Sequence, residues 1–149
     1  MKKLFIFDMD GVILDSMPIL RGMGIEMMLA HYTKYNITRE KAEEFYDKTV
    51  GLPFIQQLNE IFSKPVFDES NRIVADLYSA AHTAMAPLFP LSPMAEKVLA
   101  TAKQDGILLG LVSTTARSIC VKTQAANLPF HYFAGYDPEM PKSIQIKHI

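Results

Sequence analysis

A short apolar run followed by two aspartates near the start of the chain limits the possible folds more than any other feature. Leu4 to Phe7 are continuously apolar, a pattern typical of a parallel strand that is buried on both faces. Asp8 and Asp10 follow at the carboxyl end of this predicted strand, and Gly11 allows the backbone to turn sharply there. Ligands of open α/β sheets bind at this edge, so we expect a site at the two aspartates.

The spacing of Asp8 and Asp10 favours phosphoryl transfer. Residues two apart in a strand-like segment point to the same side, so both carboxylates can face one bound group. Asp8 can attack phosphorus and form an aspartyl-phosphate, and Asp10 can protonate the leaving group and later accept a proton from water. Because two acids repel a phosphoryl dianion, we expect Mg²⁺ as a cofactor, bound by Asp8 and Asp10.

The segment FIFDMDGVILDS, residues 5–16, resembles the first motif of the haloacid dehalogenase superfamily, most of whose members are phosphatases. The resemblance implies that Asp8 is the nucleophile, that Asp10 is the acid/base, and that the Asp8 carboxylate and the Asp10 backbone carbonyl bind Mg²⁺. The dehalogenase branch lacks the second aspartate, so Asp10 favours phosphoryl transfer over carbon–halogen chemistry. The alternatives for the aspartate pair are a solvated acidic turn, a receiver domain or a metal-binding sugar transferase.

The segment from residue 15 to residue 89 predicts helices and no strand. Ser16 and Thr38 are candidate helix caps, and Asp68 is expected to begin the last of these helices. Apolar residues at helical spacing, Ile73, Leu77 and Ala81, predict the buried face of that last helix.

Two further strands are predicted after Pro90, at residues 107–112 and 130–134, with a helix at residues 92–103. The fold class expected is α/β: a Rossmann-like parallel sheet core (1–14 and 90–149), incomplete at its C-terminal end, with an inserted helical-bundle cap (15–89). This arrangement resembles the helical-cap branch of the superfamily, which is phosphoglycolate phosphatase-like and β-phosphoglucomutase-like.

Within that branch, the turn Gly51-Leu52-Pro53 falls where a substrate-facing cap turn is found. A plain helix-breaking linker is the alternative interpretation of these three residues.

Phosphate-binding residues are expected near the ends of the second and third strands. Ser113, after an apolar strand, resembles the second motif, whose hydroxyl donates to the phosphoryl oxygens together with the backbone amide of Thr114. The third motif is a lysine that neutralises the nucleophile and the phosphate. Lys142 is the candidate, and Lys147 is the alternative.

Composition limits the cellular setting and the partners that we expect. A formal net charge of −1 gives no indication of nucleic-acid or membrane binding. No apolar run is long enough to cross a bilayer, and the single cysteine, Cys120, cannot form an internal disulfide. We therefore expect a cytoplasmic protein without a nucleic-acid or membrane partner, and the sequence does not indicate its oligomeric state. The partner implied by the resemblance is a small phosphorylated metabolite.

The resemblance also implies a fourth motif, whose acidic groups complete the metal shell, and no acidic residue follows Glu139. We expect that the chain is a fragment of a longer protein; the alternative is a degenerate member of the family.

Three functional hypotheses follow. The first is Mg²⁺-dependent hydrolysis of a small phosphomonoester, possible only in a longer form of the protein if the fourth motif is essential. The second is a sugar phosphomutase, although Leu20 stands where those mutases usually carry a histidine. The third is a noncatalytic fragment or pseudoenzyme that binds phosphate or a protein partner.

Overall fold

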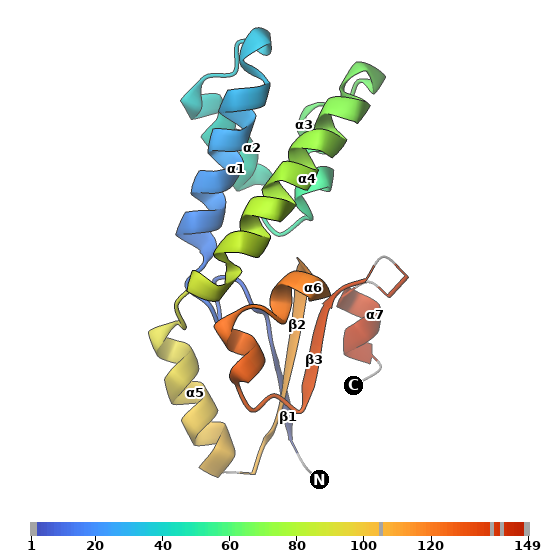
Figure 1. Cartoon of the computed structure of the whole chain (residues 1–149). Helices are drawn as coiled ribbons and strands as arrows, with labels where there is room; N and C mark the ends of the chain where they lie inside the picture. The colour runs from blue at the N-terminus through green and yellow to red at the C-terminus, as the bar shows by residue number, and fades with distance from the viewer. Residues whose placement is uncertain (1–2, 105, 138, 141, 148–149) are drawn as a thin grey trace. The chain divides into compact units, whose positions relative to one another are not determined.

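The computed structural model describes residues 3–104, 106–137, 139–140 and 142–147, without the side chains at positions 98, 101–104, 143 and 147. In chain order the strands and α-helices are β1 (Leu4–Phe7), α1 (Met17–His31), α2 (Arg39–Thr49), α3 (Phe54–Ile61), α4 (Asp68–Met85), α5 (Pro93–Gln104), β2 (Leu108–Ala116), α6 (Arg117–Cys120), β3 (Tyr132–Tyr136) and α7 (Lys142–Lys147) (Figure 1). Short 3₁₀ helices at Thr33–Tyr35, Pro65–Phe67, Ala86–Leu88 and Gln124–Asn127 lie between them. The predicted α/β class and the inserted helical region are confirmed.

The three described strands form a parallel sheet in the order β1-β2-β3. Leu4 pairs with Leu108 and Phe7 with Leu111, so the carboxyl end of β1 lies beside the middle of β2. Figure 1 shows α5 and α7 on opposite sides of this sheet. On one face, Leu99 of α5 packs with Leu109 of β2, and together these residues form a small hydrophobic cluster.

The prediction that β1 is buried on both faces is wrong. Phe5 is 47% exposed, because β1 is an edge strand of the sheet in the part of the chain that the structure describes. Leu109, Leu111 and Val112 of the central strand β2 are buried instead, as expected for a strand with a neighbour on each side.

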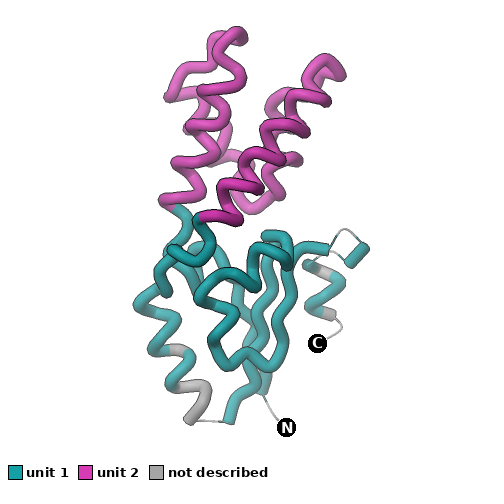
Figure 2. The backbone as a smooth tube through the Cα atoms, viewed as in Figure 1, with its two compact units in different colours: residues 1–17, 85–149 teal, residues 18–84 magenta. Residues whose placement is uncertain are grey.

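The chain divides into two compact units, which Figure 2 colours separately. One consists of Met1–Met17 and Met85–Ile149 and contains the sheet; the other, the helical unit, consists of Pro18–Ala84. The domain boundaries expected from the sequence stay a prediction. No described helix combines the length and the apolar character that a membrane span requires.

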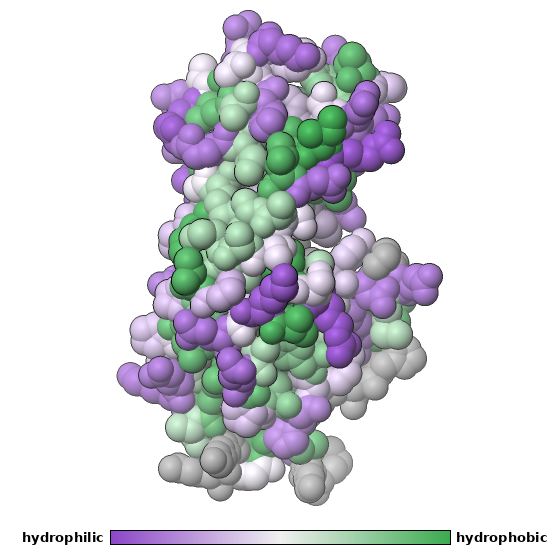
Figure 3. Space-filling model, viewed as in Figure 1, coloured by the Kyte–Doolittle hydropathy of each residue, from purple (hydrophilic) through white to green (hydrophobic). Residues whose placement is uncertain are grey.

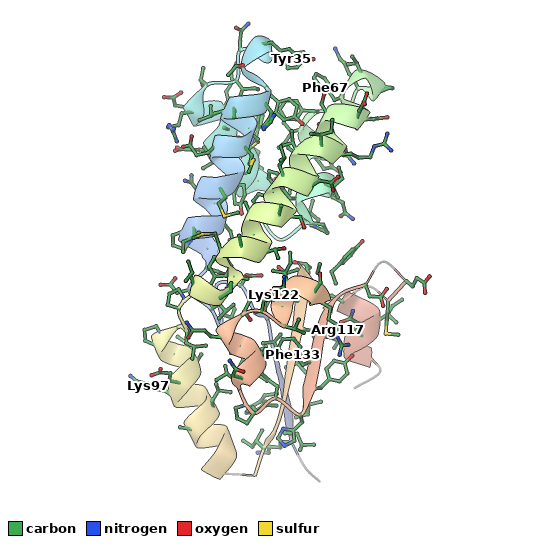
Figure 4. All side chains as sticks on the ribbon, in the orientation of Figure 1. Tyr35, Phe67, Lys97, Arg117, Lys122 and Phe133 are labelled. Atoms are coloured by element: carbon green, nitrogen blue, oxygen red, sulfur yellow. The ribbon has the colours of Figure 1, made fainter. Side chains whose placement is uncertain are left out.

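Aromatic stacking holds the helical unit together. The ring of Tyr32 stacks on Phe62 with 3.9 Å between centroids, and Phe54 stacks on Tyr78 at 4.0 Å. Tyr35 and Phe67 approach each other edge to face, as Figure 4 shows near the ends of α1 and α4. Such ring pairs add to the free energy gained from apolar burial.

The predicted apolar face of α4 is also wrong. Ile73 and Leu77 are 52% and 43% exposed, and apolar surface is visible along α4 in Figure 3. The buried residues of α4 are Asn71, Val74, Tyr78 and His82. Asn71 accepts a hydrogen bond from the Tyr32 hydroxyl at 2.5 Å and donates to the Phe62 carbonyl oxygen at 3.1 Å. Because its polar atoms have buried partners, Asn71 can occupy the interior.

Two strands differ from the predicted ranges. β2 continues through Ser113, Thr114 and Thr115 to Ala116, because the β-branched residues Thr114 and Thr115 suit an extended backbone. β3 begins at Tyr132 rather than at Phe130, whose side chain packs against the Leu99–Leu109 cluster. The run Ser113-Thr114-Thr115, expected to close the second strand, therefore lies within β2.

Candidate active site

A tight loop after β1 presents the two predicted catalytic aspartates. The Met9 carbonyl oxygen accepts hydrogen bonds from the amides of Ile13 and Leu14 at 3.0 and 2.9 Å, and Gly11 adopts a φ of +73°. Met9 itself is fully buried, whereas Asp8 is exposed and Asp10 is partly buried. Asp8 and Asp10 are therefore more exposed than Met9, the residue between them.

Asp8 is paired with Lys142, the predicted third-motif lysine. The Lys142 Nζ lies 2.8 Å from the Asp8 Oδ2, and the Asp8 Oδ1 accepts a hydrogen bond from the Met9 amide at 2.8 Å. The side chains of Asp8 and Lys142 are 45% and 30% exposed, so both remain accessible to a ligand. The alternative lysine, Lys147, has its side chain outside the described residues.

Asp10 is held by two hydroxyl groups. The Ser16 hydroxyl donates to its Oδ1 and the Thr115 hydroxyl to its Oδ2, each at 2.7 Å. Hydrogen bonds from hydroxyls to a carboxylate are short and strong, so they fix the orientation of the Asp10 side chain. Asp8 and Asp10 therefore have different neighbours: an ammonium group for one, and two neutral donors for the other.

Ser16 and Thr115 are site residues that the sequence interpretation did not assign. Ser16 was expected to cap a helix, and Ser113 was chosen from the Ser-Thr-Thr run as the phosphate ligand. No local signal identifies Thr115, because β2 has an irregular register between Val112 and Ala116 and the contact of Thr115 with Asp10 joins residues that are distant in the sequence.

Ser113 is almost fully buried, and its Oγ accepts a hydrogen bond from the Thr115 amide at 3.0 Å. Thr114 is partly buried between these two residues. Cys120 is fully buried, and its thiol donates to the Thr115 carbonyl oxygen at 3.3 Å. Burial, and then the Asp10 carboxylate, raise the pKa of the Cys120 thiol to about 12, so it is neutral at physiological pH.

The predicted cap turn, Gly51-Leu52-Pro53, lies in the helical unit before α3. Gly51 has a φ of +97°, a conformation that favours glycine. The buried Gln57 holds the turn: its Nε2 donates to the Leu52 carbonyl oxygen at 2.9 Å, and its Oε1 accepts from the Thr49 hydroxyl at 3.2 Å. The turn is therefore ordered by its own unit, and its role toward a substrate stays a prediction.

The donor chemistry of Asp8 and Asp10 fits the expected cofactor. The described residues contain no group of three or more His, Cys, Asp or Glu side chains placed to hold a metal ion. Mg²⁺, however, prefers oxygen ligands and is usually bound by one or two carboxylates, with water and substrate phosphate as its other ligands. Asp8 and Asp10 provide such a partial set of oxygen ligands.

The comparison with known families agrees with this site. Residues 5–134 match the sequence profile of the haloacid dehalogenase-like hydrolases, so the chain belongs to that family. Among proteins of curated function, no sequence matches the chain.

Solved structures of this family share the fold. A haloacid dehalogenase-like hydrolase from Streptococcus pneumoniae has a TM-score of 0.72 at 18% identity, and a predicted phosphatase from Clostridium acetobutylicum has a TM-score of 0.67 at 20% identity. The alignments with these two proteins cover 99% of this chain and 68% of theirs.

A third similar structure contains a ligand. A CbbY variant from Rhodobacter sphaeroides, in complex with xylulose-1,5-bisphosphate, has a TM-score of 0.55 at 19% identity over 91% of this chain. This chain spans 64% of the length of that protein.

Proposed function

We propose that this chain carries the phosphoryl-transfer site of a Mg²⁺-dependent phosphatase, which hydrolyses a small phosphomonoester through an aspartyl-phosphate on Asp8. The observation that carries the proposal is the pairing of two adjacent aspartates with different neighbours. Asp8 lies against the Lys142 ammonium group, and Asp10 is oriented by the hydroxyls of Ser16 and Thr115. Membership of the haloacid dehalogenase-like hydrolases supports the same chemistry.

In the first half of the proposed reaction, a carboxylate oxygen of Asp8 attacks phosphorus and the bond from phosphorus to the leaving oxygen breaks. Asp10, protonated at this stage, gives its proton to the leaving oxygen. In the second half, water attacks the phosphorus of the aspartyl-phosphate and Asp10 takes the proton from that water. Inorganic phosphate leaves, and the Asp8 carboxylate is restored.

In this proposal, the negative charge of the phosphoryl group is balanced by an ammonium group, by hydrogen-bond donors and by a metal ion. The Lys142 ammonium group already lies at Asp8, where the phosphoryl group would be bound. The Ser113 hydroxyl and the Thr114 amide would donate to phosphoryl oxygens. A bound Mg²⁺, held by the Asp8 carboxylate and the Asp10 backbone carbonyl, would supply further positive charge at the same oxygens.

The helical unit is proposed as a cap that covers the bound substrate, with Gly51-Leu52-Pro53 facing it. Lids of this kind exclude water from the reaction. The proposed substrate is a small phosphorylated metabolite, and the CbbY complex with a sugar bisphosphate supports that substrate class. A phosphomutase is less well supported, because Leu20 is buried and offers no proton donor where those mutases usually carry a histidine.

The test is the release of para-nitrophenol from its phosphate ester by this exact chain, with Mg²⁺ or with EDTA. We expect turnover that needs Mg²⁺, that Asp8→Asn abolishes by removing the nucleophile, and that Asp10→Asn slows by about 10²–10⁴-fold. Full activity in Asp8→Asn would overturn the mechanism. No turnover by the unmodified chain would overturn the proposal for this chain and favour a noncatalytic phosphate-binding role.

A further inference from the structure

A buried glutamine one helical turn after Lys142 connects α7 to the rest of the sheet unit. Gln145 is 3% exposed and lies three positions after Lys142, a spacing that places both on the same side of a helix. Its Nε2 donates to the Gly135 carbonyl oxygen in β3 at 3.0 Å and to the Met140 carbonyl oxygen at 2.7 Å. One amide group thus joins β3, the loop before Lys142 and α7.

The two acceptors fix the orientation of the Gln145 amide. Both are carbonyl oxygens, which only accept hydrogen bonds, so the amide nitrogen must face them. The Oε1 on the other side finds no hydrogen-bond donor among the described residues. A buried acceptor without a donor is unfavourable relative to an apolar group of the same shape. The contribution of this side chain therefore lies in its two donated hydrogen bonds.

The apolar side chains of α7 do not fix this helix to the sheet unit, because they are exposed. Ile144 and Ile146 are 41% and 42% exposed, and Gln145 is the buried one among the described side chains of this helix. The acceptor in β3 is itself fixed, because a Cβ at Gly135 would lie 2.5 Å from the backbone N and Cα of Arg117. Gln145 therefore connects α7 to a part of β3 that has no room to shift toward α6.

Asp137 makes two hydrogen bonds with described residues that precede Lys142. The Asp137 side chain accepts a hydrogen bond from the Glu139 amide at 2.9 Å, and its carbonyl oxygen accepts from the Met140 amide at 3.1 Å. The Met140 carbonyl oxygen is thus presented to Gln145 from a defined turn.

We propose that Gln145 is a positioning residue for the phosphoryl-transfer site: its two hydrogen bonds hold the start of α7 so that the Lys142 ammonium group reaches the Asp8 carboxylate. The catalytic consequence rests on the proposed function. The geometric consequence concerns only the Lys142–Asp8 contact and can be measured without an activity assay.

The first test measures the accessibility of the Lys142 amine by limited reductive methylation of the full chain, with each lysine quantified by peptide mass spectrometry. Lys122, exposed near the end of α6 (Figure 4), is the internal reference. Gln145→Met, which keeps the length of the side chain and removes both donors, should raise the Lys142/Lys122 labelling ratio about threefold or more. The matched control Ile144→Gln changes an exposed position of the same helix and should leave the ratio unchanged.

An unchanged ratio in a folded Gln145→Met chain would overturn the proposal, as would an equal rise in Ile144→Gln. Circular dichroism checks that each variant is folded. If Gln145→Met does not fold, Gln145→Asn takes its place, because a side chain one methylene shorter cannot reach both carbonyl oxygens. The same rise in ratio is expected for it, and no rise would again overturn the proposal.

The second test uses the pH dependence of para-nitrophenyl phosphate hydrolysis. In Gln145→Glu the ionised carboxylate would repel both carbonyl oxygens, whereas the protonated form donates one hydrogen bond. The activity of this variant relative to the unmodified chain should therefore rise as the pH falls. A constant ratio at all pH values would indicate a purely structural role and overturn the proposal. If the unmodified chain shows no turnover, the labelling result alone decides the proposal, and only the proposed function fails.

Discussion

At the scale of single residues, the neighbours of Asp8 and Asp10 suit them for different tasks. Asp8 is exposed after the end of β1 and lies beside a cation, as the proposed nucleophile requires. Asp10 is partly buried, and each of its oxygens accepts a hydroxyl hydrogen bond, so its carboxyl group has a defined direction. General acid–base catalysis requires such positioning, because the proton must be within hydrogen-bond reach of the reacting oxygen.

Thr115 should therefore affect catalysis through Asp10. Thr115→Val keeps the shape of the side chain but removes the hydroxyl that donates to the Asp10 Oδ2. We expect kcat for para-nitrophenyl phosphate to fall by about 10–100-fold, the usual loss when a group that orients a functional ligand is removed. Thr115→Ser keeps the hydroxyl and is the control. Equal losses in the two variants would show that packing, and not the hydrogen bond, is responsible.

Cys120 should be inert in the folded protein. Burial and the nearby Asp10 carboxylate raise the pKa of its thiol to about 12, from an ordinary value of 9.0. Since the thiolate is the reactive form, labelling with a disulfide reagent at pH 8 should be at least about 100-fold slower in the native chain than in denaturant. Rapid native labelling would contradict the observed burial.

The same thiol makes the stability of the folded chain decrease at high pH. The folded-state pKa is raised, so the folded chain holds this proton at pH values where the unfolded chain loses it. The contribution to stability is fully present below about pH 9 and is lost as the pH rises toward about 12. Between about pH 9 and about pH 12, the unfolding free energy of Cys120→Ala should therefore fall less than that of the unmodified chain.

At the scale of elements, α1 contains two glycines with opposite surroundings. Gly22 is exposed, and a Cβ there would meet nothing within 4 Å. Gly24 is buried, and a Cβ there would lie 2.6 Å from the Tyr46 Cδ2 and 3.2 Å from the Phe54 Cε2. The absence of a side chain at Gly24 lets α1 pack closely on α2 and α3, whereas at Gly22 it only weakens the helix.

Alanine at these two glycines should change the unfolding free energy in opposite directions. Gly22→Ala should stabilise the chain by about 0.5–1 kcal/mol, because alanine loses less backbone entropy in a helix. Gly24→Ala should destabilise it by about 1–3 kcal/mol, because buried rings must move to accept the methyl group. Urea unfolding followed by circular dichroism at 222 nm measures both changes. Stabilisation by both variants would contradict the close contact with Tyr46.

The elements also show which parts of the fold can be predicted from local sequence. The bounds of β1 and the Thr38 cap of α2 agree with the prediction, because an apolar run and a capping hydroxyl are local signals. The buried face of α4 could not be predicted, since hydropathy assigns Asn71 to the surface and Ile73 to the core. Only the partner of Asn71, the Tyr32 hydroxyl from the residue that follows α1, reverses that assignment.

At the scale of the whole molecule, parallel strand order explains why residues distant in sequence meet at the candidate site. The carboxyl ends of β1, β2 and β3 lie at one edge of the sheet. Asp8 and Lys142 lie in the segments that follow β1 and β3, and Thr115 lies near the end of β2. The resemblance of the first segment to a known motif predicted the aspartates and indicated the lysine. It did not predict Ser16, Thr115 or Gln145, whose roles depend on contacts between separate elements.

The Lys142–Asp8 ion pair allows the stability of the whole molecule to be separated from its activity. Both side chains are partly exposed, and ion pairs of this kind contribute only about 0–1 kcal/mol to folding. Preorganised charge at a reacting phosphoryl group is much more important for catalysis, so its removal costs on the order of 10²–10³-fold in rate. Lys142→Met should therefore change the unfolding free energy by less than about 1 kcal/mol and lower kcat/KM for para-nitrophenyl phosphate by that factor.

Lys122→Met is the matched control for this last prediction, because it removes an exposed lysine of the same unit and should leave both quantities unchanged. Urea unfolding and steady-state kinetics on the same samples give the two measurements. A large loss of stability in Lys142→Met would mean that the contact with Asp8 holds α7 on the sheet, and the loss of activity could then not be assigned to charge. Unchanged kinetics would remove Lys142 from the proposed site, because the proposal assigns its ammonium group, 2.8 Å from the Asp8 Oδ2, to the phosphoryl group.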